Sequence, residues 1–227
     1  MSLLSRRTFL FLWFILIFAS AVAFGLVSNL SIQQERKHVD IELRRLAQIA
    51  ARMIDGQAHQ QLTKDSDTGS VEYLRQIEPL LRLHRSAPKL LYVYTVRKNS
   101  GNVYFVLDTA KWVRAHRPEI TLIHSRVMSR YENPGPAQLA ALDMGETTAS
   151  PVYSDEYGNF KSACAPITDA TRQMVGAACI DMDVSDYLKR LRDILRADLI
   201  GFLLLVSLIT ITLPIFARLM RNTQINA

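Results

Sequence analysis

One acidic and two aromatic residues in the middle of the chain are suited to binding a small ligand. Asp108 ends a predicted strand, where its carboxylate can bind a cation or a hydrogen-bond donor, or equally cap the following loop. Tyr94 and Phe105 are candidates for lining a pocket, and an aromatic cross-strand pair in the core explains them as well. Phe105 and Asp108 differ in strand parity, so both face one pocket only if a bulge or the strand end intervenes.

No arrangement of residues in the sequence is suited to catalysis. There is no glycine-rich phosphate loop, no Ser-His-Asp or Cys-His arrangement and no nucleotide-binding motif. The five histidines lack the spacing of metal ligands, and Asp181, Asp183 and Asp186 are interpreted as helix-capping residues rather than a cation site. We therefore predict that the protein is not an enzyme and that it holds no metal and no cofactor.

The two cysteines lie on the two strands of a predicted hairpin within Ser150–Asp183. These strands are expected at about Phe160–Ile167 and Met174–Asp181. Either register parity places Cys164 and Cys179 on the same face, directly opposite or diagonal to each other. In an oxidising compartment this geometry allows a disulfide, and the alternative is two small apolar residues packed against a helix.

Two helices and another hairpin are predicted upstream. Apolar residues at steps of three and four predict a long helix over Ser31–Leu62, with a break or bend at Asp55-Gly56. The same periodicity predicts a second helix over Val71–His84. The turn sequence Lys98-Asn99-Ser100-Gly101 has β-rich sequence on both sides, which is typical of a hairpin and would place Arg97 opposite Asn102.

The connection from Lys111 to Thr148 is long and mostly irregular. A short helix is expected after Pro136, with Gly145 just beyond its end. A long connection inside a compact domain is usually functional. This one lies between strands of one predicted sheet, so we expect it to cover one face of that sheet.

Two uncharged apolar segments, Thr8–Leu30 and Leu199–Ala217, are long enough to cross a membrane. We interpret the first as an uncleaved signal anchor, although Ala21-Val22-Ala23 resembles the cleavage site of a signal peptide. The expected order is a cytoplasmic head, a first span, an extracytoplasmic (periplasmic) domain, a second span in the same inner membrane and a cytoplasmic tail. Their boundaries are 1–7, 8–30, 31–197, 198–217 and 218–227.

The formal net charge of +6 comes mainly from the two ends of the chain. Four arginines flank the apolar segments without accompanying acids, and the middle of the chain is nearly balanced. No dense basic stripe with interleaved aromatic residues is present, so we predict no binding of nucleic acid.

Several motifs between Leu46 and Leu188 follow one another in an order that is typical of a known family. After the long helix with its IDG sequence come YVYTV, GNVYFVLDT, PVYSDEYGNFKSACAPITD and GAACIDMD. In this order the chain resembles the single-Cache (PAS-like, PDC-type) extracytoplasmic sensor domains of bacterial membrane signalling proteins. The resemblance implies an α+β fold with a central antiparallel sheet of about five strands. A long N-terminal helix would cover one face and a small-molecule pocket the other, and homodimers are usual.

The resemblance also implies positions for ligand-binding residues. In amino-acid-binding relatives, a Tyr-x-Asp element and an aspartate at the end of the last strand touch the amino group of the ligand. Tyr153-Ser154-Asp155 and Asp181 occupy comparable places here. Lys161 is a further candidate; it, Tyr153 and Asp155 also fit plain turn residues, and Asp181 also fits a helix cap. The Arg-x-Trp-aromatic element that grips the carboxylate is not evident, so a free amino acid is not expected.

These expectations combine into a membrane-anchored small-molecule sensor. Ligand binding in the outer domain would move the second transmembrane helix. Two alternatives stay open: an accessory protein that acts on a separate membrane or cytoplasmic partner, and the input half of a longer diguanylate cyclase or histidine kinase. The expected partners are a small ligand, the membrane, a second copy of the chain and a separate signalling protein.

Overall fold

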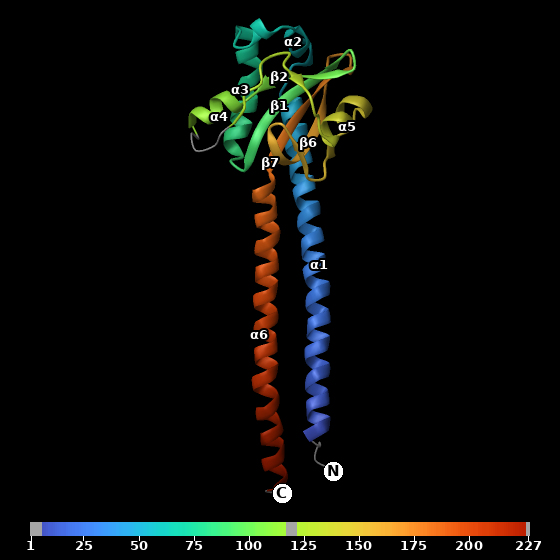
Figure 1. Ribbon diagram of the computed structural model, residues 1–227, viewed down its shortest axis with the longest axis vertical. Helices are drawn as coiled ribbons and strands as arrows, with labels where there is room; N and C mark the ends of the chain where they lie inside the picture. The colour runs from blue at the N-terminus through green and yellow to red at the C-terminus, as the bar shows by residue number, and fades with distance from the viewer. Residues whose placement is uncertain (1–5, 117–121, 226–227) are drawn as a thin grey trace. The chain divides into compact units, whose positions relative to one another are not determined.

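The computed structural model describes residues 6–116 and 122–225 (Figure 1). The chain divides into two compact units. Residues 1–36 and 189–227 form one unit, and residues 37–188 form the other. The predicted cytoplasmic ends, 1–7 and 218–227, lie partly outside the described residues.

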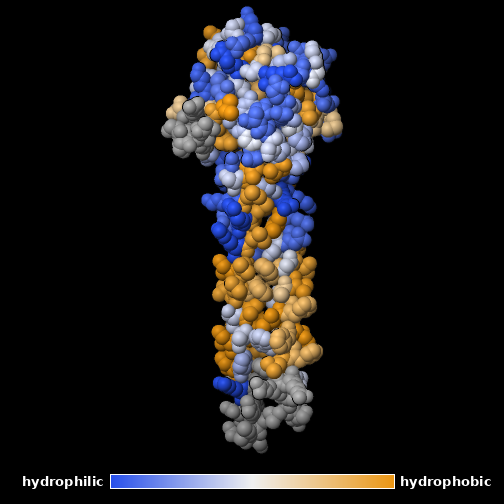
Figure 2. All heavy atoms as spheres, in the orientation of Figure 1, coloured by the Kyte–Doolittle hydropathy of each residue, from blue (hydrophilic) through white to orange (hydrophobic). Residues whose placement is uncertain are grey.

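The first unit consists of segments of two long helices, α1 (Arg6–Arg52) and α6 (Val184–Ile225). Both helices are long and apolar enough to cross a membrane. Their apolar side chains remain exposed, and Figure 2 shows them as a band of orange residues. Phe24 and Phe202 stack with ring centroids 4.9 Å apart, and Arg190 lies 3.7 Å from Glu35. Such a surface needs a lipid or protein environment to cover it.

The second unit is built on one antiparallel sheet with the strand order β3-β2-β1-β7-β6-β4, and β5 pairs with β6. The strands are β1 (Leu90–Asn99), β2 (Asn102–Asp108), β3 (Arg130–Tyr131), β4 (Thr148–Ala149), β5 (Tyr153–Asp155), β6 (Gly158–Thr168) and β7 (Met174–Asp183). The sheet has seven strands where about five were predicted. The three short strands β3, β4 and β5 have only two or three residues each, so they carry no periodic signal in the sequence.

Four shorter helices and a 3₁₀ turn complete this unit: α2 (Gly56–Gln61), η1 (Asp65–Asp67), α3 (Val71–Ser86), α4 (Ala110–His116) and α5 (Pro136–Met144). The end of α1, together with α2 and α3, covers one face of the sheet. His59 of α2, for example, bonds the hydroxyl of Thr95 at 2.8 Å. Helix α5 covers the opposite face and contributes Ala137 and Ala141 to a core that also contains Phe160. The predicted helix-covered and pocket-bearing faces are therefore distinct.

The predicted long helix is interrupted at its end. Helix α1 stops at Arg52, and Oδ1 of Asp55 accepts hydrogen bonds from the amides of Gln57 and Ala58 at the start of α2. The bend predicted at Asp55-Gly56 is confirmed, and a continuous helix to residue 62 is wrong. Close packing explains the glycine, because a Cβ at Gly56 would lie 2.5 Å from the carbonyl oxygen of Thr168.

The first hairpin has a tighter turn than predicted. Ser100 and Gly101 both adopt positive φ, 48° and 83°, and form a two-residue turn between Asn99 and Asn102. The expected pairing of Arg97 with Asn102 is therefore wrong, since Asn99 takes that place. Farther along, the register shifts between Thr95 and Val96, which pair with Leu107 and Phe105. This irregularity meets the condition for Phe105 and Asp108 to face the same side.

The second hairpin pairs Cys164 directly with Cys179, and the two form a disulfide in the buried core. Their Cα atoms are 4.2 Å apart, a spacing close to that of a non-hydrogen-bonded pair. At the end of β7, Oδ1 of Asp183 accepts a hydrogen bond from the amide of Ser185 at 2.6 Å. Asp183 thus caps the start of α6, as the sequence predicts.

Candidate functional site

A small cavity lies on the face of the sheet opposite α1. Five aromatic rings and two carboxylates dominate its lining, which comprises Tyr92, Tyr94, Phe105, Asp108, Ile123, Ser125, Tyr131, Tyr157 and Asp181. The cavity leaves about 10 Å³ for the centres of water-sized molecules, which is room for about one water. Its own side chains therefore nearly fill it, and a larger ligand requires the lining to move.

Asp181 is the most unusual group in this lining. Its side chain is buried, and burial raises the pKa of the carboxyl from 3.8 to about 8. The hydroxyl of Ser162 donates to its Oδ1 at 2.5 Å and opposes this shift, whereas the charges of Asp155 and Asp108 add to it. None of the described lining residues is a lysine or an arginine. The site thus holds a buried acid without a cationic partner among them.

Asp181 belongs to a closed ring of hydrogen bonds that joins five elements of the domain. Tyr94 donates to Oδ1 of Asp181 at 3.3 Å, and Nε2 of Gln138 donates to the hydroxyls of Tyr94 at 2.5 Å and Tyr153 at 2.9 Å. The hydroxyls of Tyr153 and Ser162 are 3.0 Å apart. Each of the three hydroxyl protons, on Tyr94, Tyr153 and Ser162, has one acceptor if Tyr153 donates to Ser162 and Ser162 donates to Asp181. Because burial raises the pKa of Tyr94 and Tyr153, both phenols remain protonated donors.

Asp155 lies beside this ring but is not among the residues that line the cavity. Its Oδ2 accepts a hydrogen bond from the hydroxyl of Tyr131 at 2.5 Å, and its Oδ1 accepts one from the amide of Tyr157. Burial raises the pKa of this carboxyl as well. Tyr131 stacks on Phe105 with ring centroids 4.7 Å apart, so Asp155 fixes one wall of the cavity through Tyr131.

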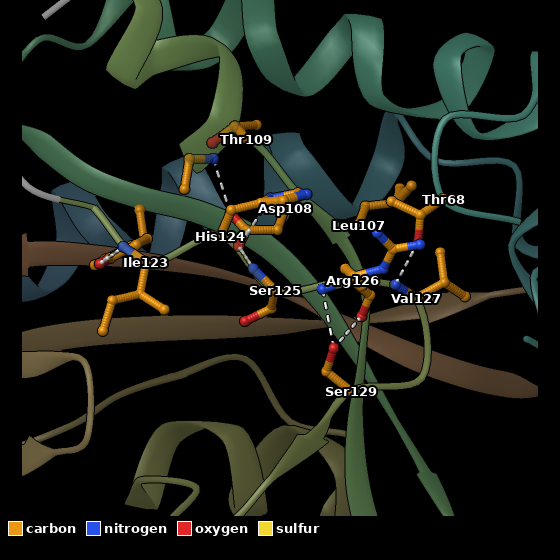
Figure 3. Close-up of polar contacts among 12 residues, drawn as sticks. Thr68, Leu107, Asp108, Thr109, Ile123, His124, Ser125, Arg126, Val127 and Ser129 are labelled. Carbon is orange, nitrogen blue, oxygen red and sulfur yellow. Dashed lines mark hydrogen bonds and ion pairs between the residues drawn. The ribbon is translucent and has the colours of Figure 1, made fainter. Parts of the chain in front are cut away.

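Asp108 lines the cavity, but both of its oxygens already have backbone partners. Figure 3 shows its carboxylate between two amides: Oδ1 accepts from Ala110 at 2.8 Å, and Oδ2 accepts from Ser125 at 2.6 Å. Nδ1 of His124 lies 3.6 Å from Oδ2. The alternative interpretation of Asp108, a strand-end acid that fixes the next loop, therefore accounts for its bonds.

The segment 122–129 closes the cavity on one side. The amide of Ile123 donates to the hydroxyl of Tyr92 at 3.1 Å, and the hydroxyls of Ser125 and Tyr157 are 3.1 Å apart. The segment lies across the end of β2 in Figure 3. The expectation that this long connection covers one sheet face is confirmed for these residues.

The predicted ligand-binding residues divide into three groups. Tyr94, Phe105, Asp108 and Asp181 line the cavity. Asp155 bonds the lining residue Tyr131, and Tyr153 belongs to the hydrogen-bonded ring that includes Asp181. Lys161 belongs to neither group, because it points to the opposite face of the sheet, where it reaches Asp40 on α1. Strand alternation explains this, since the neighbouring Ser162 faces the cavity.

Several residues of the site were missed by sequence reasoning: Tyr92, Ile123, Ser125, Tyr131, Gln138, Tyr157 and Ser162. Alternation could have found two of them. Tyr92 shares the parity of Tyr94 on β1, and Ser162 lies opposite Asp181 in the β6–β7 register. Gln138 gave no such signal, because its role depends on where α5 packs.

Replacing Asp108 by Ala is expected to loosen the segment 122–129. The substitution leaves the amides of Ala110 and Ser125 without their acceptor, and each loss costs about 1–3 kcal/mol. Hydrogen exchange of the segment should rise, and the thermal midpoint of the domain should fall. Unchanged exchange at Ser125 would show that Asp108 does not hold the segment.

The antiparallel sheet, with a long N-terminal helix on one face and the cavity on the other, has the arrangement that the resemblance to single-Cache domains implies. The domain is similar in structure to the ligand-binding domain of the Campylobacter jejuni chemoreceptor Tlp3 in complex with L-valine. That match has a TM-score of 0.48 and 14% identity, and covers 84% of this chain and 67% of that chain. It is also similar to the E. coli DcuS sensor domain, with a TM-score of 0.46 and 16% identity, covering 72% of this chain and 98% of that one. No family model matches the sequence, and no curated protein matches it.

Proposed function

We propose that the chain is a membrane-anchored sensor whose outer domain binds a small ligand through an ammonium group. The observation that carries this proposal is the buried carboxyl of Asp181 in an aromatic cavity whose described lining contains no lysine or arginine. A ligand cation would pair with this carboxylate and lower its pKa, because the opposite charge offsets the cost of burying the ionised group. The tyrosine and phenylalanine faces around it would add cation–π attraction.

The charges in the lining also indicate which class of ligand fits the cavity. A ligand carboxylate would find no lysine or arginine among the described lining residues, whereas an ammonium group finds an acid. An amine without a carboxylate therefore fits better than a free amino acid. Since the cavity has room for only about one water, binding must displace lining groups such as Tyr157 or the segment 122–129. The bound and free domains would then differ in structure, as a sensor requires.

The connection to the membrane supports a signalling role. Asp181 lies three residues before Val184, where α6 begins, and α6 continues without a break through an apolar stretch of membrane-spanning length. The buried disulfide is of a kind that persists outside the reducing cytoplasm. We therefore place the domain in the periplasm, with α1 and α6 crossing the inner membrane, and propose no catalytic activity.

Small amines are expected to stabilise the outer domain. A ligand that binds only the folded state at 100 times its Kd raises the unfolding free energy by about 2.7 kcal/mol. Thermal unfolding of the full chain in lipid nanodiscs should be followed with alkylamines, amino alcohols and polyamines, each beside a carboxylate of matched size. Stabilisation by the carboxylates and by none of the amines would contradict the proposal.

Binding at neutral pH should also release a proton. The free Asp181 carboxyl, with a pKa of about 8, is mostly protonated at pH 7, and it must ionise to pair with an ammonium group. Affinity should thus rise with pH up to about 8 and then level off. Titration calorimetry in two buffers of different ionisation enthalpy measures the released proton, and equal heats in both would count against an Asp181–ammonium pair.

A further inference from the structure

Lys161 is a buried lysine that contacts three separate segments of the domain. Its Nζ lies 2.7 Å from Oδ1 of Asp40 on α1 and donates to the carbonyl oxygen of Ser150 at 3.0 Å. It also lies over the ring of Tyr187, in the first turns of α6, at 5.3 Å from the centroid. Only 7% of the lysine side chain is exposed. One side chain on β6 therefore connects the helix that enters the domain with the helix that leaves it.

The next residue on the same strand, Ser162, bonds the cavity-lining residue Asp181. Ser162 faces the opposite side of the sheet, where its hydroxyl donates to Asp181 and lies 3.0 Å from that of Tyr153. Ser150 ties the two positions together, because its amide donates to the carbonyl of Ser162 and its hydroxyl accepts from the Ser162 amide. A shift of β6 at Ser162 is consequently also a shift of the backbone that carries Lys161.

We infer that Lys161 is the positioning residue that transmits the state of the cavity to α1 and α6. When a ligand opens the ring around Asp181, Ser162 moves, and Lys161 passes that movement to Asp40 and Tyr187. The inference deepens the proposed sensor function and rests on it for its biological meaning. The sequence placed Lys161 among the ligand-binding candidates, and the structure gives it contacts of a different kind.

The test uses a substitution in the cavity as the stimulus, so it does not depend on any ligand. Tyr94→Phe keeps the ring but removes the hydroxyl that bonds Asp181 and Gln138. Hydrogen exchange of the full chain in lipid nanodiscs is measured over 37–44 on α1 and 184–191 on α6. In the otherwise native chain, Tyr94→Phe should raise exchange in both segments several-fold. In a chain that already carries Lys161→Met, adding Tyr94→Phe should not raise exchange above that of Lys161→Met alone.

Two further variants make the result specific. Lys98→Met removes a β1 lysine whose ion-pair partner, Asp143 at 2.5 Å, lies on α5 and not on α1 or α6, so the effect of Tyr94→Phe should persist in that background. If Lys161→Met does not fold, Asp40→Asn tests the same link, because it breaks only the α1 contact. In that background the response of 37–44 should disappear while that of 184–191 remains.

Two results would overturn the inference. One is an equal rise on Tyr94→Phe with and without Lys161, which would make the lysine a purely structural ion pair. The other is no rise in either segment in any background, which would show that the cavity is not connected to the helices. A failure of amines to bind would contradict the proposed ligand class but would change neither exchange result. The proposal for the ligand and the inference about Lys161 can therefore fail independently.

Discussion

The chain carrying Asp181→Asn is expected to lose binding of amines and to gain stability above neutral pH. Asparagine retains an oxygen that accepts the hydrogen bonds of Ser162 and Tyr94, so the ring around the cavity should survive. The negative charge that pairs with an ammonium group is removed. Loss of one partner of a buried charge pair costs about 2–5 kcal/mol, which corresponds to a loss of affinity of about 30-fold or more.

The stability effect follows from the raised pKa of Asp181. Its carboxyl has a pKa of about 8 in the folded chain and 3.8 as the reference value. Between these values the folded state holds a proton that the unfolded state releases, so unfolding becomes easier as pH rises. The slope is about 1.4 kcal/mol per pH unit for one such group. Asparagine does not titrate, so the variant should lack this loss and exceed the native chain most clearly near pH 8.

Thermal unfolding of both proteins between pH 5 and about 8 measures this difference. A suitable readout is the fluorescence of Trp112, which stacks on Tyr73 with ring centroids 6.0 Å apart. Asp143→Asn is the matched control, because Asp143 is exposed and is not among the residues that line the cavity. If Asp181→Asn and Asp143→Asn have the same pH profile, Asp181 is not the buried titrating group.

Replacing Cys164 and Cys179 together by Ala is expected to destabilise the domain by about 3 kcal/mol. The disulfide closes a segment with a sequence separation of 15, and its loss gives the unfolded chain the freedom that the bond removes. For a domain of this size, about 3 kcal/mol corresponds to a fall in the thermal midpoint of roughly 6–12 °C. Both sulfurs are fully buried in the core, so lost packing adds to the effect.

Urea unfolding of the native chain and the double variant, with and without a reducing agent, separates these contributions. The native chain should lose stability only when the reagent reaches sulfurs exposed by partial unfolding, whereas the double variant should not respond. Equal stability of the oxidised native chain and the variant would contradict a structural role for the disulfide. It would also remove one support for an oxidising compartment.

Local features of the sequence determined much of the fold. The periodicity of Val71–His84, the turn at Ser100-Gly101 and the parity of the two cysteines each depend on residues close together in the chain. The Asp183 cap and the bend after Arg52 were predicted for the same reason. The two apolar segments likewise needed only length and composition.

The site was determined by tertiary structure. Gln138 closes the ring because α5 packs against β6 and β7. The bulge in β2 brings Asp108 to the same face of the sheet as Phe105. Parity separates Lys161 from Ser162, but only the packing of α1 decides which face is covered and which bears the cavity. These contacts join residues that lie tens of positions apart, and no short-range pattern encodes such distances. The sequence alone therefore supplied the acids and the aromatic rings, and the folded sheet decided which of them surround one cavity.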